Sequence, residues 1–255
     1  MDIEQAIGEQ LRQWGFSVQK IPESKVQGEK CPDYRVSDSS TDTYLVEVKP
    51  REDDPTESEQ RHKTLGRGEV YGEHRALVRS NTVSGIIRDA YLQLKDYGEP
   101  ECMRVAFLCA TDRAQEAKYE QFKAALYGST PMSDLEGDGY RRPCYFFKNS
   151  DFFRYKEVLD AAVVSTLRVA QLCLNPHSPK FKQVWGSALA QKFGTAICNP
   201  VAEEAAGDAY LVDSTIDRGN SEEVLNYLRD KYQAPKLFHV DLGWHSGTVL
   251  EPPGA

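Results

Sequence analysis

Apolar side chains recur at helical spacing near the start of the chain, and this pattern predicts an opening helix over residues 2–14. The positions that share one helical face are Ile3, Ile7, Leu11 and Trp14. Gly15 follows the last of them and is expected to end the helix. The next residues, 16–18, then predict the start of a strand.

Two short apolar stretches follow, separated by a polar segment rich in turn-forming residues. Residues 32–36 and 43–49 have the composition of strands, and residues 37–42 read Ser-Asp-Ser-Ser-Thr-Asp. The two strands are therefore expected to form a hairpin. Pro50 is expected to end the second strand, because proline cannot donate a hydrogen bond to a neighbouring strand.

Residues 51–81 are strongly charged, contain several glycines and show no clear period, so a long insertion loop is expected there. Helical and strand patterns then alternate again. They predict a helix over 82–97, a strand over 103–110, a helix over 115–126, a strand over 143–148 and a helix beginning in 152–167. This alternation predicts an α/β fold for residues 1–165.

The remainder of the chain, residues 166–255, carries weaker patterns of the same kind. Strands are expected over 169–174, 195–197, 209–212 and 237–242, and helices over 181–193 and 221–232. The pattern leaves two interpretations open. This C-terminal α/β region is either an extension of the first sheet or a small second domain.

Composition narrows the class of protein. The chain has 255 residues, 27% of them charged and 40% hydrophobic, which is ordinary for a globular protein. No apolar run approaches the roughly 20 residues of a membrane span, and the acidic N-terminus lacks the pattern of a signal peptide. Six scattered cysteines without metal-ligand spacing are expected to be buried thiols. We therefore expect a cytoplasmic protein, and the net charge of −8 argues against one that coats nucleic acid.

The most informative residues lie in the expected hairpin. Asp33 precedes the first strand, and the second strand carries Glu47 and Lys49 on one face because alternate strand residues point the same way. Two carboxylates can hold Mg²⁺, and a nearby ammonium can steady a phosphate or an attacking water. The pair Pro32-Asp33 is followed, after thirteen residues, by Glu47-Val48-Lys49. This pattern resembles the PD-(D/E)XK nuclease superfamily.

The resemblance implies a restriction-endonuclease-like core, in which a central mixed β-sheet is flanked by helices. Right-handed crossovers would then place helix 82–97 across the sheet from the first helix. The implied metal ligands are Asp33, Glu47 and the backbone carbonyl of Val48, with Mg²⁺ as cofactor and Mn²⁺ able to substitute. Lys49 would stand beside the scissile phosphate.

Two further residues join the implied site, each with an alternative interpretation. The opening helix, with Glu4 eleven residues before Gly15-Phe16, resembles that of Holliday-junction resolvases, in which a glutamate reaches the metal. Glu4 otherwise only complements the helix dipole. Gln93 occupies the helix after the Glu-X-Lys strand, where related enzymes place a glutamine or an arginine. Its alternative is an ordinary surface glutamine.

The sequence supports two candidate functions. The first is a metal-dependent nuclease that hydrolyses phosphodiester bonds, with DNA favoured over RNA and roles in defence, restriction or repair by analogy only. The alternative is an inactive nuclease-fold module that binds nucleic acid or, through the C-terminal region, a protein partner. A homodimer is left open. Two interpretations of the charged insertion, residues 51–81, also stay open: it contacts phosphate groups of the substrate, or it is simply solvated. Its basic residues are Arg51, Arg61, Lys63, Arg67, Arg75 and Arg79.

Overall fold

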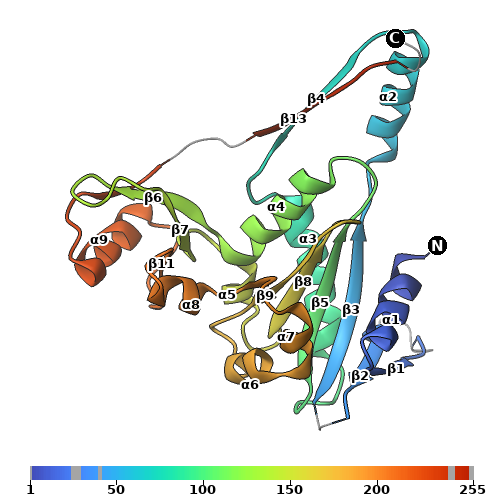
Figure 1. Ribbon diagram of the computed structural model, residues 1–255, viewed down its shortest axis with the longest axis horizontal. Helices are drawn as coiled ribbons and strands as arrows, with labels where there is room; N and C mark the ends of the chain where they lie inside the picture. Colours follow the sequence, from blue (N-terminus) through green and yellow to red (C-terminus); the bar gives the residue numbers. More distant parts are fainter. Residues whose placement is uncertain (1, 24–29, 40–41, 241–244, 253–255) are drawn as a thin grey trace.

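A seven-stranded mixed sheet forms the centre of the molecule (Figure 1). The computed structural model describes residues 2–23, 30–39, 42–240 and 245–252. In spatial order the strands are β1 (Ser17–Lys20), β2 (Tyr34–Ser37), β3 (Thr43–Arg51), β5 (Met103–Ala110), β8 (Ala161–Ser165), β9 (Ala170–Leu174) and β10 (Ile197–Cys198). Strands β3, β5 and β8 run parallel, whereas β1–β2, β2–β3 and β8–β9 are antiparallel pairs. The predicted α/β class, with helices flanking a mixed sheet, is confirmed.

Helices cover both faces of this sheet, because its central strands are apolar on both sides. On one face α1 (Ile3–Gln13) places Leu11 against Val46 and Val48 of β3. On the other, α3 (Asn81–Lys95) places Ile87 against Leu45. The expectation that these two helices lie on opposite faces is therefore confirmed. The remaining covering helices are α4 (Gln115–Tyr127), α6 (Phe181–Gly186) and α7 (Ala188–Phe193).

The strands after residue 165 join sheets that begin earlier in the chain. β9 and β10 extend the central sheet. A second, four-stranded sheet places β11 (Tyr210–Leu211) beside β7 (Arg142–Tyr145), and β12 (Leu237–His239) beside β6 (Thr130–Asp134). Helix α8 (Pro200–Ala205) contacts β11 and α9 (Ser221–Tyr232) contacts β12, whereas the short helix α5 (Asp151–Arg154) lies against α4 and α3. No helix in the described ranges is long and apolar enough to cross a membrane.

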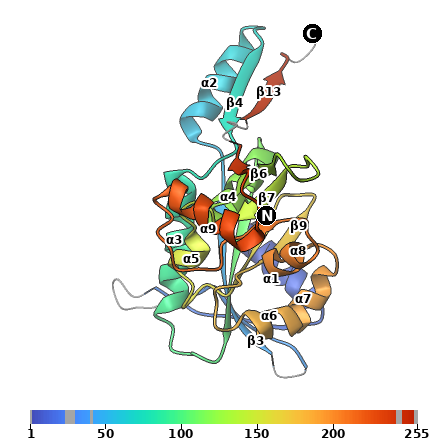
Figure 2. The ribbon, with the colours of Figure 1, turned by 90° about the vertical axis from the view of Figure 1, so that its left-hand side faces the viewer.

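An arm projects from the end of β3, where a loop was expected over residues 51–81 (Figures 1 and 2). It consists of α2 (Pro55–Gly66), β4 (Tyr71–Ala76) and β13 (His245–Leu250), and β4 pairs with β13 in an antiparallel ribbon. The helix starts at Asp54, whose carboxylate accepts from the amide of Thr56. Its surface is polar all round, so it shows no apolar period. The partner of β4 lies near the other end of the chain, which is why local pattern does not predict the ribbon.

Two further expectations are wrong. The helix expected over 152–167 is the short helix α5 followed by strand β8, whose side chains are all buried. A short apolar run of this kind does not distinguish a buried strand from a helix. Pro50 also does not end β3, which continues to Arg51. The pairing with β2 stops at Val46, so the missing amide hydrogen of Pro50 costs no hydrogen bond on that edge.

Candidate metal and phosphate site

Asp33 lies directly before β2, and its side chain bonds to β3 just beyond the end of the β2–β3 pairing. The ladder between these strands ends at Tyr34 opposite Val46. One position beyond it, Asp33 Oδ2 accepts a 2.7 Å hydrogen bond from the amide of Val48. The amide and carbonyl of one strand residue point to the same edge. The carbonyl of Val48 therefore faces the same side as the Asp33 carboxylate.

Glu47 points from β3 to the face that α3 covers, and it is fully buried. Within the described residues neither of its carboxylate oxygens receives a hydrogen bond. Burial raises the pKa of Glu47 to about 8, and the nearby Asp33 carboxylate adds to this, while Lys49 opposes it. Burial likewise raises the pKa of Asp33. A fully buried carboxylate that has one lysine as its cation and lies beside a second, partly buried carboxylate is costly, so these oxygens fit the ligands of a hard metal ion.

Lys49 completes the group from the same strand. Its Nζ lies 2.5 Å from Glu47 Oε1 and donates a hydrogen bond to Gln93 Oε1 on α3. Gln93 in turn donates through Nε2 to the carbonyl of Cys31, at 3.1 Å. The ammonium is therefore fixed between a strand and a helix, while about a fifth of the side chain (22%) stays exposed. We call Asp33, Glu47, Lys49 and Gln93 the acid–lysine site.

Glu4 lies at the margin of this site. Its Oε1 forms a 2.8 Å ion pair with Lys20, and its charge contributes to the raised pKa of Asp33 after burial. It does not close a three-acid group with Asp33 and Glu47 among the residues described. Sequence reasoning missed Lys20, which reaches the margin because β1 aligns it opposite Tyr34. A lone lysine in an exposed strand gives no signal for such a position.

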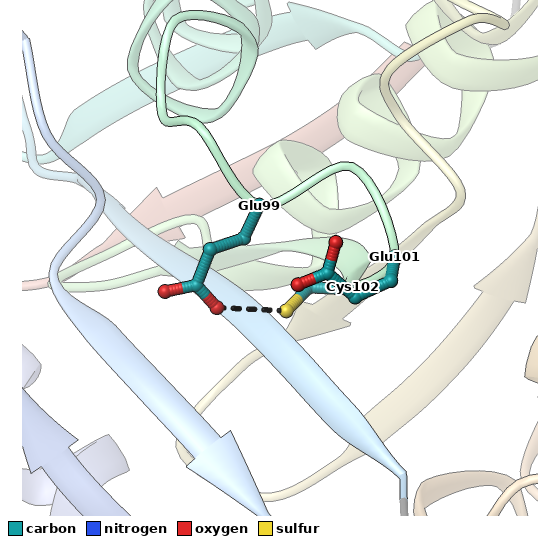
Figure 3. A group of neighbouring side chains, drawn as sticks. All are labelled: Glu99, Glu101 and Cys102. Carbon is teal, nitrogen blue, oxygen red and sulfur yellow. Dashed lines mark hydrogen bonds between the residues drawn. The ribbon is translucent and has the colours of Figure 1, made fainter.

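A different cluster meets the simplest distance test for a metal site. Glu99, Glu101 and Cys102 have ligand atoms within 4.8 Å of one another. Figure 3 shows Glu99 and Cys102 pointing toward one another, and the thiol donates to Glu99 Oε2 at 3.0 Å. Burial and this carboxylate raise the pKa of Cys102 to about 12. Arg35 pairs with the same carboxylate at 2.8 Å, so Glu99 already has its cation. The cluster of Glu99, Glu101 and Cys102 is therefore a hydrogen-bonded turn before β5.

The basic residues of the arm are mostly engaged within the protein rather than free for phosphate. Arg61 is buried against Asp53, and Arg75 pairs with both Glu57 and Glu73. The other engaged members are Arg51 with Gln121, Lys63 with Glu59 and Arg79 with Asp151. The arm therefore offers less free positive charge than its composition indicated.

Two hollows of the described structure lie away from the acid–lysine site. A hollow of about 410 Å³ lies between the end of α1 and α7, and one of about 270 Å³ lies beside α4; neither is lined by Asp33, Glu47 or Lys49. Comparison of the chain with protein-family models, with curated proteins and with solved structures finds no match.

Proposed function

We propose that this protein is a Mg²⁺-dependent nuclease that hydrolyses phosphodiester bonds, with DNA as the favoured substrate. One observation carries the proposal. The fully buried carboxylate of Glu47, whose oxygens receive no hydrogen bond among the described residues, lies near the partly buried carboxylate of Asp33 and beside a lysine that Gln93 holds in place. An arrangement of this kind destabilises the metal-free protein, and such cost is typical of functional sites.

The oxygen atoms at the site suit a divalent cation. Asp33 keeps one carboxylate oxygen beyond the bond to Val48, Glu47 offers Oε2 together with an Oε1 that now pairs with Lys49, and the Val48 carbonyl faces the same edge as Asp33. Mg²⁺ prefers such oxygen ligands and retains several waters. When bound, it supplies the positive charge that polarises the phosphate and lowers the pKa of an attacking water. We propose Glu4 as an outer acid of the site rather than a direct ligand.

Lys49 provides the second positive charge. Its ammonium is placed to donate to a non-bridging phosphate oxygen, or to orient the attacking water, once Glu47 is engaged by the cation. Gln93 keeps the ammonium at the site, because it accepts from Nζ while it is itself anchored to the Cys31 carbonyl. Direct attack by water then needs no covalent intermediate with the protein.

The strand arrangement supports a restriction-endonuclease-like core. Asp33 directly precedes β2, Glu47 lies on β3, and these strands pair antiparallel, while β3 pairs in parallel with β5 along its other edge. Helices α1 and α3 cover opposite faces. The resemblance led us to expect a mixed sheet flanked by helices, and we propose the restriction-endonuclease-like core on this basis.

Cleavage assays test the proposal directly. Supercoiled plasmid, linear duplex, single-stranded DNA and RNA are incubated with wild type and with Asp33→Ala, Glu47→Gln and Lys49→Ala, in Mg²⁺, Mn²⁺ or EDTA. We expect wild type to cleave DNA only with metal, and each variant to lose activity by about 100-fold or more. Glu157→Gln makes the same chemical change as Glu47→Gln at an exposed position and should cleave normally.

Metal titration separates the nuclease from an inactive module. Calorimetry should detect Mn²⁺ binding to wild type and to Lys49→Ala, but not to Asp33→Ala. If wild type takes up no divalent ion and cleaves none of the substrates, the nuclease proposal is wrong. Normal cleavage by Lys49→Ala would remove the role proposed for its ammonium.

A further inference from the structure

Two tyrosines from different helices stack on the surface beside α3. The rings of Tyr91 and Tyr155 are 4.3 Å apart between centroids and inclined by 17°. Both side chains are partly exposed. Tyr91 lies on α3 and Tyr155 directly follows α5, and the two helices are side by side in both views (Figures 1 and 2). A partly exposed pair of stacked rings offers a platform on which a planar base can lie.

Cationic residues lie over Tyr91 and next to Tyr155 in the chain. Lys95 lies 5.8 Å from the Tyr91 ring centroid, and Lys156 lies 4.6 Å from that of Phe153, which neighbours Tyr155 in the chain. Arg88 precedes Tyr91 by three residues, so it lies on the same side of α3. In the described part of the chain, none of these three cations forms an ion pair with an acid, in contrast to the basic residues of the arm. Their charge is therefore available to phosphate groups.

The platform lies across α3 from the acid–lysine site. Tyr91 and Gln93 are two residues apart in the helix, so their side chains point about 200° apart around its axis. Gln93 reaches Lys49 on one flank, while Tyr91 reaches Tyr155 on the other. A chain bound at Lys49 needs only to cross one helix, a width of roughly 10 Å, to reach the tyrosines.

We propose that Arg88, Tyr91, Lys95, Tyr155 and Lys156 form a tyrosine–lysine surface that binds a single strand of nucleic acid continuing from the acid–lysine site. The inference rests on the proposed nuclease function for its connection to cleavage. Stacked aromatic rings flanked by free cations match the two repeating features of a strand, its bases and its phosphates. In a chain with net charge −8, binding of this polyanion requires such a local surface.

Fluorescence anisotropy with a fluorescein-labelled oligothymidine of about 20 nucleotides, in EDTA, tests the surface without cleavage. We expect Tyr91→Ala and Tyr155→Ala each to weaken binding about tenfold, while Tyr155→Phe, which keeps the ring, binds like wild type. Lys95→Ala should lower the slope of log affinity against log salt by about 0.7, the loss of one phosphate contact. Matched controls are Tyr140→Ala and Lys182→Ala, which change exposed residues elsewhere and should leave binding unchanged.

The outcomes separate the two proposals. No binding of the oligonucleotide by wild type, or unchanged affinity in both tyrosine-to-alanine variants with normal folding by circular dichroism, would overturn the tyrosine–lysine surface. If the surface variants weaken binding but no substrate is cleaved with metal, the surface stands and the nuclease proposal falls. If cleavage depends on metal but the variants bind as wild type does, the nuclease proposal stands and the surface falls.

Discussion

Asp53 links the arm to the body of the protein, and its removal is expected to be strongly destabilising. The residue lies just beyond β3 and is almost fully buried, with its side chain 4% exposed. Its two carboxylate oxygens accept from Lys118 Nζ at 2.7 Å and from Arg61 Nη1 at 3.0 Å. Burial raises the pKa of Asp53, but these two cations outweigh burial and hold the pKa below its usual range. The carboxylate therefore remains charged at neutral pH.

The size of the effect follows from what Asp53→Ala leaves behind. Lys118 is 1% exposed and would retain only the Thr111 carbonyl, at 2.8 Å, as a partner among the described residues. Loss of one member of a buried ion pair typically costs about 3–5 kcal/mol, because the remaining charge stays buried. The double variant Asp53→Ala/Lys118→Met removes that charge. It should recover about 2 kcal/mol of the loss, even though it makes one more substitution.

Urea unfolding followed by circular dichroism measures these differences. Asp53→Ala should lower the midpoint by about 1 M or more. The matched control is Glu59→Ala, which breaks the exposed pair with Lys63 and should cost less than about 1 kcal/mol. A cost below about 1 kcal/mol for Asp53→Ala, or a double variant that is less stable than the single one, would refute the reasoning.

Three further outcomes are expected. Glu47→Gln should abolish the rise in Tm that Mn²⁺ gives to wild type, because the site loses a carboxylate ligand; calorimetric scans beside Glu157→Gln check this, and a retained rise would contradict the reasoning. Gln93→Met should lower kcat about tenfold with KM little changed, measured by initial rates, because Lys49 loses its acceptor; unchanged rates would remove the positioning role. Burial, then Arg218, lowers the pKa of His177 to about 4. The free energy of unfolding therefore does not depend on His177 above pH 6.5. It falls as the pH drops toward 4, because the unfolded chain then binds a proton that the folded protein does not. His177→Gln should flatten that part of the stability curve by about 2 kcal/mol, and a slope as steep as in wild type would contradict this.

Local pattern was sufficient for the elements whose burial is periodic. The opening helix, helix α3 and strand β5 were all predicted, because each buries one helical face or a continuous apolar run. Prediction failed where structure depends on distant partners or on burial of both faces. Strand β8 has the pattern of a helix because all five of its side chains are buried, and β13 has no apolar alternation of its own.

The candidate site was partly predictable for a related reason. Asp33, Glu47 and Lys49 are fixed by hairpin geometry, so their spacing in sequence translates directly into proximity. The bond between Lys49 and Gln93 spans two elements, and only the packing of α3 on β3 brings it about. The pairing of Glu4 with Lys20 was not foreseeable, because it depends on where β1 lies relative to the start of α1.

The ribbon of the arm also constrains the order in which the molecule can be completed during synthesis. β4 and β13 are separated by roughly 170 residues, so β4 leaves the ribosome long before its partner strand exists. The strands that carry Asp33, Glu47 and Lys49 can pair as soon as β5 has emerged. A nascent chain therefore assembles its proposed chemical centre first and acquires the finished arm last. Strand β13 thus decides when the projecting arm is complete.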